Sequence, residues 1–498
     1  MGIEKGDLRS VNFMLINFWN LDLRFENLPD NWVVTQISEI WFTTSGGTPS
    51  RSNKNYFSGN IPWLKSGELK NKPINNSEEF ISEEAVQQSN TKIIPKGALL
   101  IALYGATVGR LGILNIDAAI NQAICAIIPN PKVLTDYLFW FLFSTRKDLL
   151  DQRKGGAQPN ISQSQISNLK FPLPPLPEQH RIVAKLEELF TKLDVSVAEL
   201  KKAKAQIKRY RQSVLKYAFE GKLTEQWRIA NGELRNETAE ELLSKIKEER
   251  KKALGKKYKE LPPVDATNLP HLPEGWVWTC LGEIITVSSG SGLTSAHMKS
   301  NGSYAVYGGN GVSGYYDKYM FEKRRLIIGR VGAKCGVVHI TDPFSWVTDN
   351  ALIVEFNNLD MKFLFYLIHV LNLNQHSVST AQPVISGAKI YPIINPLPPL
   401  KEQQQIVSEI ERHFSVADET EKIIDQSLKQ AERLRQSILK DAFSGKLVPQ
   451  DPNDPPASLL LEKIKAEKEK LAKEPKTKKS NRRTGRKVVG EDKAEREK

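Results

Sequence analysis

The sequence predicts an α+β protein made of two copies of one unit, each a mixed α/β globular domain followed by a long helix. Three observations indicate this fold class. A Pro-rich motif that opens a long amphipathic segment contains Glu178-Gln179 and recurs at Glu402-Gln403, 224 residues later (402 − 178 = 224). The segment before each copy is rich in short β-type runs and Gly/Asn/Ser turns. The repeat runs without gaps through the long segment, which indicates internal pseudo-twofold symmetry.

The two globular domains, here called heads, share an opening. Leu28-Pro29-Asp30-Asn31-Trp32 begins the first, and Leu272-Pro273-Glu274-Gly275-Trp276 begins the second, 244 residues later (276 − 32 = 244). Because the offset falls to 224 at the helices, the second head is 20 residues shorter (244 − 224 = 20). The predicted divisions are an N-terminal extension at 1–27, the first head at 28–177, a central helical region at 178–262, the second head at 272–400, a C-terminal helical region at 401–474 and a basic tail at 475–498.

Inside the heads, short apolar runs predict buried strands. Two further echoes link the heads: Gly105-Ala106 with Gly109 matches Gly332-Ala333 with Gly336, and Ala157-Gln158-Pro159 matches Ala381-Gln382-Pro383. Between these landmarks the sequences differ widely, so one scaffold carries two different heads. The predicted strands are 98–104 and 123–128 in the first head, and 325–328, 336–340 and 351–356 in the second.

Each long segment is predicted to form one helix of a coiled coil. Pro177 suits a first helical turn, and Gly221 and Gly445 stand where a left-handed C-cap is expected. Apolar residues recur in steps of four and three, the period of a coiled coil. Two matching helices in one chain favour intramolecular pairing. The predicted seam comprises Ile182, Leu186, Leu189, Leu193, Leu200, Ile207 and Val214, with Ile406, Ile410, Ile424, Leu434 and Ile438 on the second helix.

A shorter charged helix is predicted after each long one, at 239–254 and 457–471, with an offset of 218 (457 − 239 = 218). These helices either fold back on the two long helices or offer an amphipathic face to a partner. The tail from Pro475 onward is basic and of low complexity, which is typical of a disordered, solvated end.

Charge and composition narrow the function. The net charge of +13 and a pI near 9.3 favour a polyanionic partner, nucleic acid before membrane. The longest apolar runs are far shorter than a membrane span, and the N-terminus lacks a signal-peptide pattern. Three scattered cysteines predict no disulfide framework, and no Cys/His pair has zinc-ligand spacing. We therefore expect a cytoplasmic protein without a bound metal.

Catalytic motifs are weak. Asp454-Pro455-Pro456-Ala457 lacks the aromatic residue of an adenine methyltransferase motif, and Gly105-Ala106-Thr107-Val108-Gly109 lacks the Gly-Lys-Ser/Thr ending of a P-loop. Pro29-Asp30 with Glu68-Leu69-Lys70 could hold Mg²⁺ in a nuclease, but the second copy has no matching Glu-x-Lys. We predict a binding protein that contains no catalytic residue and no cofactor site.

The repeated motifs resemble a known family. The Leu-Pro-x-x-Trp openings, Gly46-Gly47-Thr48-Pro49-Ser50-Arg51, and Tyr307-Gly308-Gly309-Asn310-Gly311 resemble target-recognition domains of type I restriction–modification specificity subunits. The Pro-Leu-Pro-Pro-Leu-x-Glu-Gln helices resemble the spacer regions of that family. The resemblance covers about residues 28 to 473 and implies antiparallel pairing of the two helices.

This resemblance also implies a function. It implies a non-catalytic subunit that reads a bipartite, gapped, asymmetric site in double-stranded DNA. It further implies two modification (methyltransferase) subunits and restriction (translocase/nuclease) subunits as partners. S-adenosylmethionine, ATP and Mg²⁺ would then belong to those partners, and methylation and cleavage with them.

Recognition of DNA bases requires amide, hydroxyl and basic side chains on loops that contact the base edges, and other basic side chains that contact the phosphates. The residues of these types that we predict to contact DNA are Arg51, Asn53, Lys54, Lys65 and Arg110 in the first head, and Lys299, Asn310, Tyr315, Arg330 and Lys334 in the second.

Three alternatives stay open. A stand-alone sequence-specific DNA-binding protein would copurify without modification subunits. A coiled-coil scaffold without restriction partners would show no sequence-dependent DNA binding. A fused methyltransferase–nuclease would bind S-adenosylmethionine by itself.

Overall fold

The computed structural model describes residue 25 and residues 27–151, 160–231, 238–332, 334–377 and 383–473; for residue 257 and residues 471–473 it describes the backbone alone. The predicted basic tail, nearly all of the N-terminal extension and the Ala157-Gln158-Pro159 echo lie outside these ranges. The chain forms two compact units, and each is described by itself. Unit 1 combines the chain up to Val197 with the chain from Lys429, and unit 2 is Ala198–Leu428. Both long helices therefore contribute to both units.

The first head, in unit 1, contains two mixed sheets and a small two-stranded ladder. The larger sheet has the strand order β2-β10-β7-β8-β4, the second β5-β3-β9-β6, and the ladder pairs β1 with β11. The strands are β1 (Val33–Gln36), β2 (Thr43–Ser45), β3 (Ile61–Leu64), β4 (Lys72–Ile74), β5 (Glu79–Ile81), β6 (Ile93–Ile94), β7 (Leu99–Ala102), β8 (Leu111–Leu114), β9 (Ala118–Ile120), β10 (Ile124–Ile127) and β11 (Lys170–Leu173). The helices are α1 (Ile37–Ile40), α2 (Glu83–Gln88), α3 (Thr135–Asp151) and α4 (Gln163–Ser167).

The second head, in unit 2, has the same core topology. Its sheets have the orders β13-β19-β16-β17 and β15-β14-β18, and β12 pairs with β20. The strands are β12 (Val277–Cys280), β13 (Thr286–Ser289), β14 (Tyr304–Gly308), β15 (Gly311–Tyr316), β16 (Leu326–Gly329), β17 (Val338–Ile340), β18 (Trp346–Val347), β19 (Ala351–Glu355) and β20 (Ile394–Leu397). The helices are α8 (Leu281–Ile284), α9 (Met361–Leu371) and α10 (Gly387–Ile390).

The two heads share one arrangement of their core strands. In both, the larger sheet is antiparallel through its first four strands, and one parallel pair, β3 with β9 or β14 with β18, lies in the second sheet. Among the described residues, β4, β6 and α2 have no counterpart in the second head, in keeping with its shorter sequence. The five predicted strands are confirmed as β7, β10, β16, β17 and β19, and β7 and β10 are fully buried because every residue in them is apolar.

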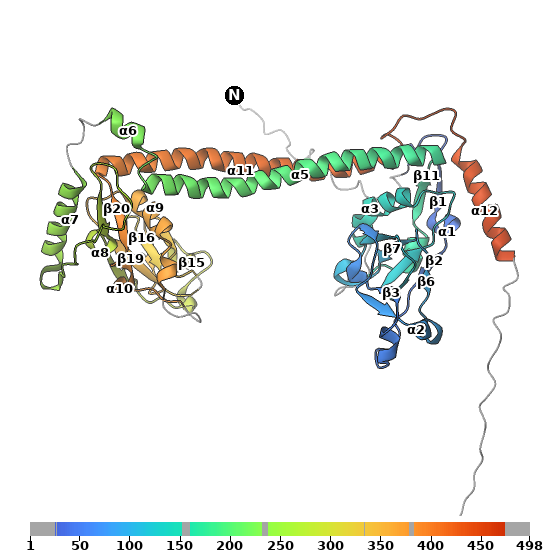
Figure 1. The fold of residues 1–498 in the computed structure, drawn as a ribbon, viewed down its shortest axis with the longest axis horizontal. Helices are drawn as coiled ribbons and strands as arrows, with labels where there is room; N and C mark the ends of the chain where they lie inside the picture. Colours follow the sequence, from blue (N-terminus) through green and yellow to red (C-terminus); the bar gives the residue numbers. More distant parts are fainter. Residues whose placement is uncertain are drawn as a thin grey trace, which may run out of the picture. The chain divides into compact units, whose positions relative to one another are not determined.

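The two long helices are α5 (Leu176–Phe219) and α11 (Leu400–Ala442) (Figure 1). In unit 2, Lys204 pairs with Asp425 and Arg211 with Asp418, each at 2.7 Å. In unit 1, Arg435 pairs with Asp194. Residue numbers rise along one helix as they fall along the other, so the pairing is antiparallel in each unit. The predicted intramolecular coiled coil is confirmed.

The observed seam differs from the predicted one at Leu434. This side chain is 49% exposed, whereas Ile438 is buried, so Leu434 is not a seam residue. The inward positions are instead Ala431 and Arg435. The guanidinium of Arg435 lies 4.6 Å from the ring centroid of Phe190 and also pairs with an acid of α5. The long stem of arginine fills the apolar position while its head reaches a carboxylate, which an apolar pattern cannot indicate.

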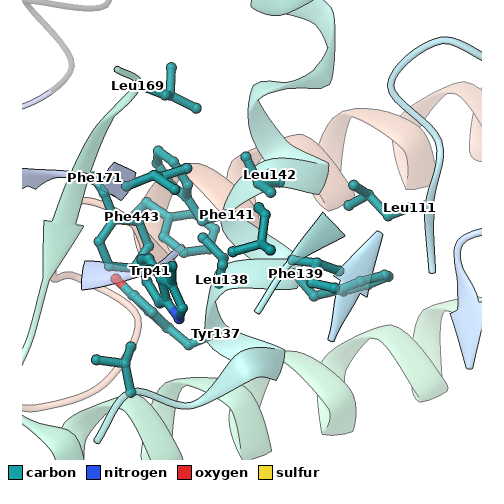
Figure 2. Close-up of a cluster of buried hydrophobic side chains, with 14 of the residues drawn as sticks. Trp41, Leu111, Tyr137, Leu138, Phe139, Phe141, Leu142, Leu169, Phe171 and Phe443 are labelled. Atoms are coloured by element: carbon teal, nitrogen blue, oxygen red, sulfur yellow. The ribbon is translucent and has the colours of Figure 1, made fainter. Parts of the chain in front are cut away.

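The core of unit 1 includes the far end of α11. Phe443 lies 5.3 Å from Tyr137 and 5.4 Å from Phe141 between ring centroids, both on α3, and Figure 2 shows these rings gathered with Phe171 and Trp41. The core of unit 2 likewise includes Val214 and Phe219 from the end of α5. Each head therefore packs on the start of one long helix and on the end of the other.

Three shorter helices complete the chain: α6 (Glu225–Ala230), α7 (Ala239–Leu254) and α12 (Ala457–Lys473). The structure folds both charged helices back, and each forms an ion pair with a head, whereas the prediction placed them on the long helices or against a partner. Lys247 of α7 pairs with Glu283 of α8 at 2.6 Å, and Lys465 of α12 pairs with Glu39 of α1 at 3.0 Å. The offset of 218 holds for these lysines (465 − 247 = 218). No described helix is both long and apolar enough to cross a membrane.

Candidate nucleic-acid interface

Each head is held on its helices by a buried polar cluster, here called a junction. In junction 1, Glu178 at the start of α5 accepts the indole N–H of Trp32 at 3.0 Å and the side-chain amide of Gln450 at 2.6 Å. Glu178 is fully buried. A buried carboxylate requires hydrogen-bond donors, and this one receives them from the head opening and from the chain after α11.

Junction 2 repeats this arrangement with a cation added. Glu402 at the start of α11 accepts the indole N–H of Trp276 at 2.8 Å and the hydroxyl of Thr224 at 2.7 Å. Arg228 of α6 pairs with the same carboxylate at 2.5 Å, and the side chains of Arg228 and Glu402 are 10% and 3% exposed. The second junction is therefore a buried ion pair, whereas Glu178 has neutral donors.

The glutamine after each glutamate has one role in both units. Gln179 accepts the backbone N–H of Leu134 at 2.9 Å and donates to the carbonyl of Pro174 at 3.0 Å. Gln403 accepts the backbone N–H of Asp360 at 3.1 Å and donates to the carbonyl of Pro398 at 2.9 Å. Each glutamine thereby joins the start of a long helix to the start of the head's own helix, α3 or α9.

The glycines after the long helices complete the junctions. Gly221 and Gly445 have φ values of +70° and +72°. A β-carbon at Gly221 would collide with the ring of Pro273, and one at Gly445 with the ring of Pro29. The repeated motifs that are remote in the sequence, namely the Leu-Pro-x-x-Trp opening, the Glu-Gln helix start and the Gly-Lys-Leu helix end, therefore meet at one place in each unit. Their recurrence in both halves of the chain was the signal of this role, but not of the contacts.

In junction 1, burial disfavours the charged form of the Glu178 carboxyl. Burial raises the pKa of the Glu178 carboxyl, and the hydrogen bonds from Gln450 and Trp32 oppose this shift. The largest effect on Glu178 is therefore the cost of removing its charge from water.

Four of the predicted DNA contacts in the first head lie on one segment. Arg51 and Lys65 both pair with Glu79 at 2.8 Å. The guanidinium of Arg51 also lies 4.4 Å from the ring centroid of Phe57. Asn53 caps a 3-10 turn by accepting the N–H of Asn55 at 3.1 Å, and the adjacent Lys54 is exposed. The structure thus gives Arg51, Lys65 and Asn53 local partners.

The fifth, Arg110, lies apart from these, directly before β8. It follows the Gly105–Gly109 turn and acts electrostatically on Arg146 of α3. Sequence reasoning did not identify Arg146, which is 36 residues away in the chain (146 − 110 = 36).

The predicted contacts in the second head lie in three places. Lys299 and Tyr315 are bridged through their backbones, and Lys299 also pairs with Asp317. Arg330 donates to Ser289 at 3.1 Å, beside the turn that carries the exposed Lys334. Asn310 is exposed in the hairpin between β14 and β15.

An open polar hollow of ≈ 490 Å³ in the first head was not predicted as a site. Gly46 and Gly47 form part of its wall, and a β-carbon on either would collide with backbone atoms. Gln122 accepts the hydroxyl of Thr48 across it. Its other lining residues are Ser50, Gln88, Ser89 and Asn90, so the lining is uncharged and rich in groups that can read base edges.

Two heads of one topology, each held where two antiparallel helices meet, define a two-headed recognition subunit formed by internal duplication. Within the described ranges, no three His, Cys, Asp or Glu side chains gather in a way that could hold a metal ion. The family model described as "Type I restriction modification DNA specificity domain" matches residues 29–207 and 273–430. The chain belongs to this family of type I restriction–modification specificity subunits.

Individual relatives agree with this assignment. The specificity subunit of the type I restriction enzyme EcoDI of Escherichia coli is 26% identical over 468 residues, which cover 89% of this chain and 96% of that protein. The EcoKI specificity subunit of E. coli K12 is also 26% identical, with the same coverage. The HsdS subunit of Thermoanaerobacter tengcongensis has a similar fold, with a TM-score of 0.53 at 18% identity over 84% of this chain and 98% of that one. A chain from a study of type I R-M complex assembly has a TM-score of 0.63 at 18% identity, covering 84% and 99%.

Proposed function

We propose that this chain reads a bipartite, gapped, asymmetric site in double-stranded DNA. One observation carries the proposal: two junctions of the same design hold two heads that differ outside their shared core. Two unlike heads on one chain can read two unlike half-sites, and the unread stretch between them gives the gap. The net charge of +13 supports a polyanionic ligand.

We further propose that the chain recruits two modification subunits and, with them, restriction subunits. In this proposal the chain is not catalytic and binds no cofactor, and S-adenosylmethionine, ATP and Mg²⁺ act in the partners. The work would take place in the cytoplasm, where DNA and these partners occur. The family assignment and the relatives' names as subunits of restriction enzymes support the proposal.

Methylation mapping tests both parts. The chain is expressed with its modification subunits in a host that lacks other DNA methyltransferases, and the genome is sequenced for modified bases. We expect one asymmetric, two-part motif that disappears when this chain is omitted. The purified chain alone should transfer no methyl group from S-adenosylmethionine to DNA. A palindromic or undivided motif would contradict the two-head proposal, and methyl transfer by the pure chain would contradict the non-catalytic role.

The alternative of a stand-alone DNA-binding protein predicts the opposite outcome. It would bind one DNA sequence without a modification subunit and leave no methylation. The same host, with and without the modification subunits, separates these two functions.

A further inference from the structure

The first head contains two arginines, Arg110 and Arg146, that interact electrostatically. Arg110 directly precedes β8, and Arg146 lies on α3, which packs against β8. Burial lowers the pKa of Arg146, and the like charge of Arg110 lowers it further. No acid contributes to that shift. An uncompensated pair of cations in a partly buried place destabilises the free protein.

The geometry holds Arg146 in place. Its terminal nitrogen donates to the carbonyl of Val108 at 3.3 Å. A β-carbon added at Gly109 would lie 3.0 Å from Cγ of Arg146, so the glycine, at φ +72°, lets the side chain lie against the turn. The Nε of Arg146 is buried and has no hydrogen-bond partner among the described residues. A buried guanidinium nitrogen without an acceptor is costly unless a ligand supplies one.

The surroundings offer space but no counter-charge. A β-carbon at Gly105, at the other end of the same turn, would meet nothing within 4 Å. Within the described part of the chain, no carboxylate forms an ion pair with Arg110 or Arg146.

From this geometry we infer that Arg110 and Arg146 form a phosphate-binding site, and that its ligand is a phosphodiester of the DNA backbone beside the half-site of the first head. The inference rests on the proposed function for the identity of the ligand. Guanidinium groups bind phosphate through several N–H donors, and the single negative charge of a phosphodiester between two arginines would offset much of their mutual repulsion.

The position of the site in the fold fits a sequence-independent role. The Gly105–Gly109 turn has a counterpart in the second head, where Gly332 and Gly336 both have φ of +82°. Phosphate contacts set the position of a protein on DNA, while base contacts set its specificity. A turn that two differing heads share is suited to the first task. In the second head the exposed Lys334 lies on this turn and Val337 takes the position of Arg110, so a lysine replaces the arginine pair.

Salt-dependent DNA binding tests the inference. Arg110→Met and Arg146→Met remove the charge and keep an apolar stem, and Arg412→Met on α11 is the control, since its guanidinium already pairs with Glu409 at 2.9 Å. Fluorescence anisotropy with the full chain and its modification subunits measures Kd for a duplex with the mapped site and for a scrambled duplex. For each test variant, the slope of log Kd plotted against the logarithm of the salt concentration should become shallower by about one. Both duplexes should be affected equally, and the control should leave the slope unchanged.

Stability provides a second readout that requires no DNA. Without an anion, Arg110→Met should raise the Tm of the full chain because it removes a repulsion. Inorganic phosphate should raise the Tm of the wild type more than that of either test variant. A wild type that binds DNA while the variants keep its salt slope would overturn the inference and leave the proposed function standing. If the wild type bound no DNA, the proposed function would fail. The rise of Tm with inorganic phosphate would then test the arginine site by itself, and an equal rise in the wild type and both variants would reject the site.

Discussion

The two junction glutamates occupy equivalent places in the repeat, but the structure predicts unequal losses of stability on the same substitution. Glu402→Gln leaves the guanidinium of Arg228 buried without a carboxylate. Removal of one partner from a buried ion pair costs about 3–5 kcal/mol. The side chains of Arg228 and Glu402 are 10% and 3% exposed, so solvent screens little of this cost. Thr224 and the carbonyl of Gly221 still contact Arg228, which points to the lower end, about 3 kcal/mol.

Glu178→Gln meets only neutral partners. The new amide oxygen can accept the indole N–H of Trp32. Gln450 can turn its own carbonyl toward the new NH₂ group, since the amide has both a donor and an acceptor end. The substitution also removes a charge that burial disfavours. We expect a change in stability of at most about 1 kcal/mol in either direction.

The raised pKa of Glu178 also predicts how the stability of junction 1 depends on pH. The folded state raises the pKa of Glu178 above its ordinary value of 4.5, so the protonated form favours folding. This contribution to stability is complete below pH 4.5 and is lost as the pH rises through the raised pKa. In the wild type, the amides of junction 1 should therefore lose protection against hydrogen exchange as the pH rises from 4.5 through the raised pKa of Glu178. Glu178→Gln should remove this dependence.

Native-state hydrogen exchange measures both effects, because it reports the opening free energy of each segment separately. Amides at the start of α11 should lose about 3 kcal/mol of protection in Glu402→Gln, while those at the start of α5 should change little in Glu178→Gln. Equal losses at the two junctions, or a larger loss in Glu178→Gln, would refute the assignment of the ion pair as the difference between them.

The remaining predictions concern the helices and heads. Gly445→Ala should cost at least about 1–2 kcal/mol from its positive φ alone, whereas Gly67→Ala, with open space around it, should be nearly neutral in the same denaturant titration. Insertion of four helical residues at Val197–Ala198 together with four at Leu428–Lys429 adds about 6 Å to each helix. At roughly 3.4 Å per base pair, methylation mapping should show a gap longer by one or two base pairs with both half-sites unchanged. The insertion in α5 alone mismatches the antiparallel register, and an unchanged gap in an active double insertion would reject the helices as the spacer. Exchange of residues 28–170 for the matching head of a relative should change one half of the methylated motif, and a change in both halves would show that the heads do not read independently.

The sequence by itself determined the elements and their duplication. Apolar periodicity near 3.5 identified α5 and α11, and short buried apolar runs identified β7, β10 and β19, because each pattern depends on near neighbours in the chain. The recurrence of the same motifs in the same order identified two copies of one unit. The resemblance of those motifs to a family, which the family model bears out, pointed to the function class.

Only the tertiary structure decided which parts meet. Phe443, directly after α11, packs against Phe141 in the core of the first head, 302 residues away along the chain (443 − 141 = 302). No local pattern encodes that choice, since it depends on shape and burial across the fold. For the same reason the seam prediction was wrong at Leu434, where an arginine with a distant carboxylate took the inward position. The difference between the junctions, and the meeting of Arg110 with Arg146, likewise arise from side chains that are remote in sequence, so their energies exist only in the folded chain.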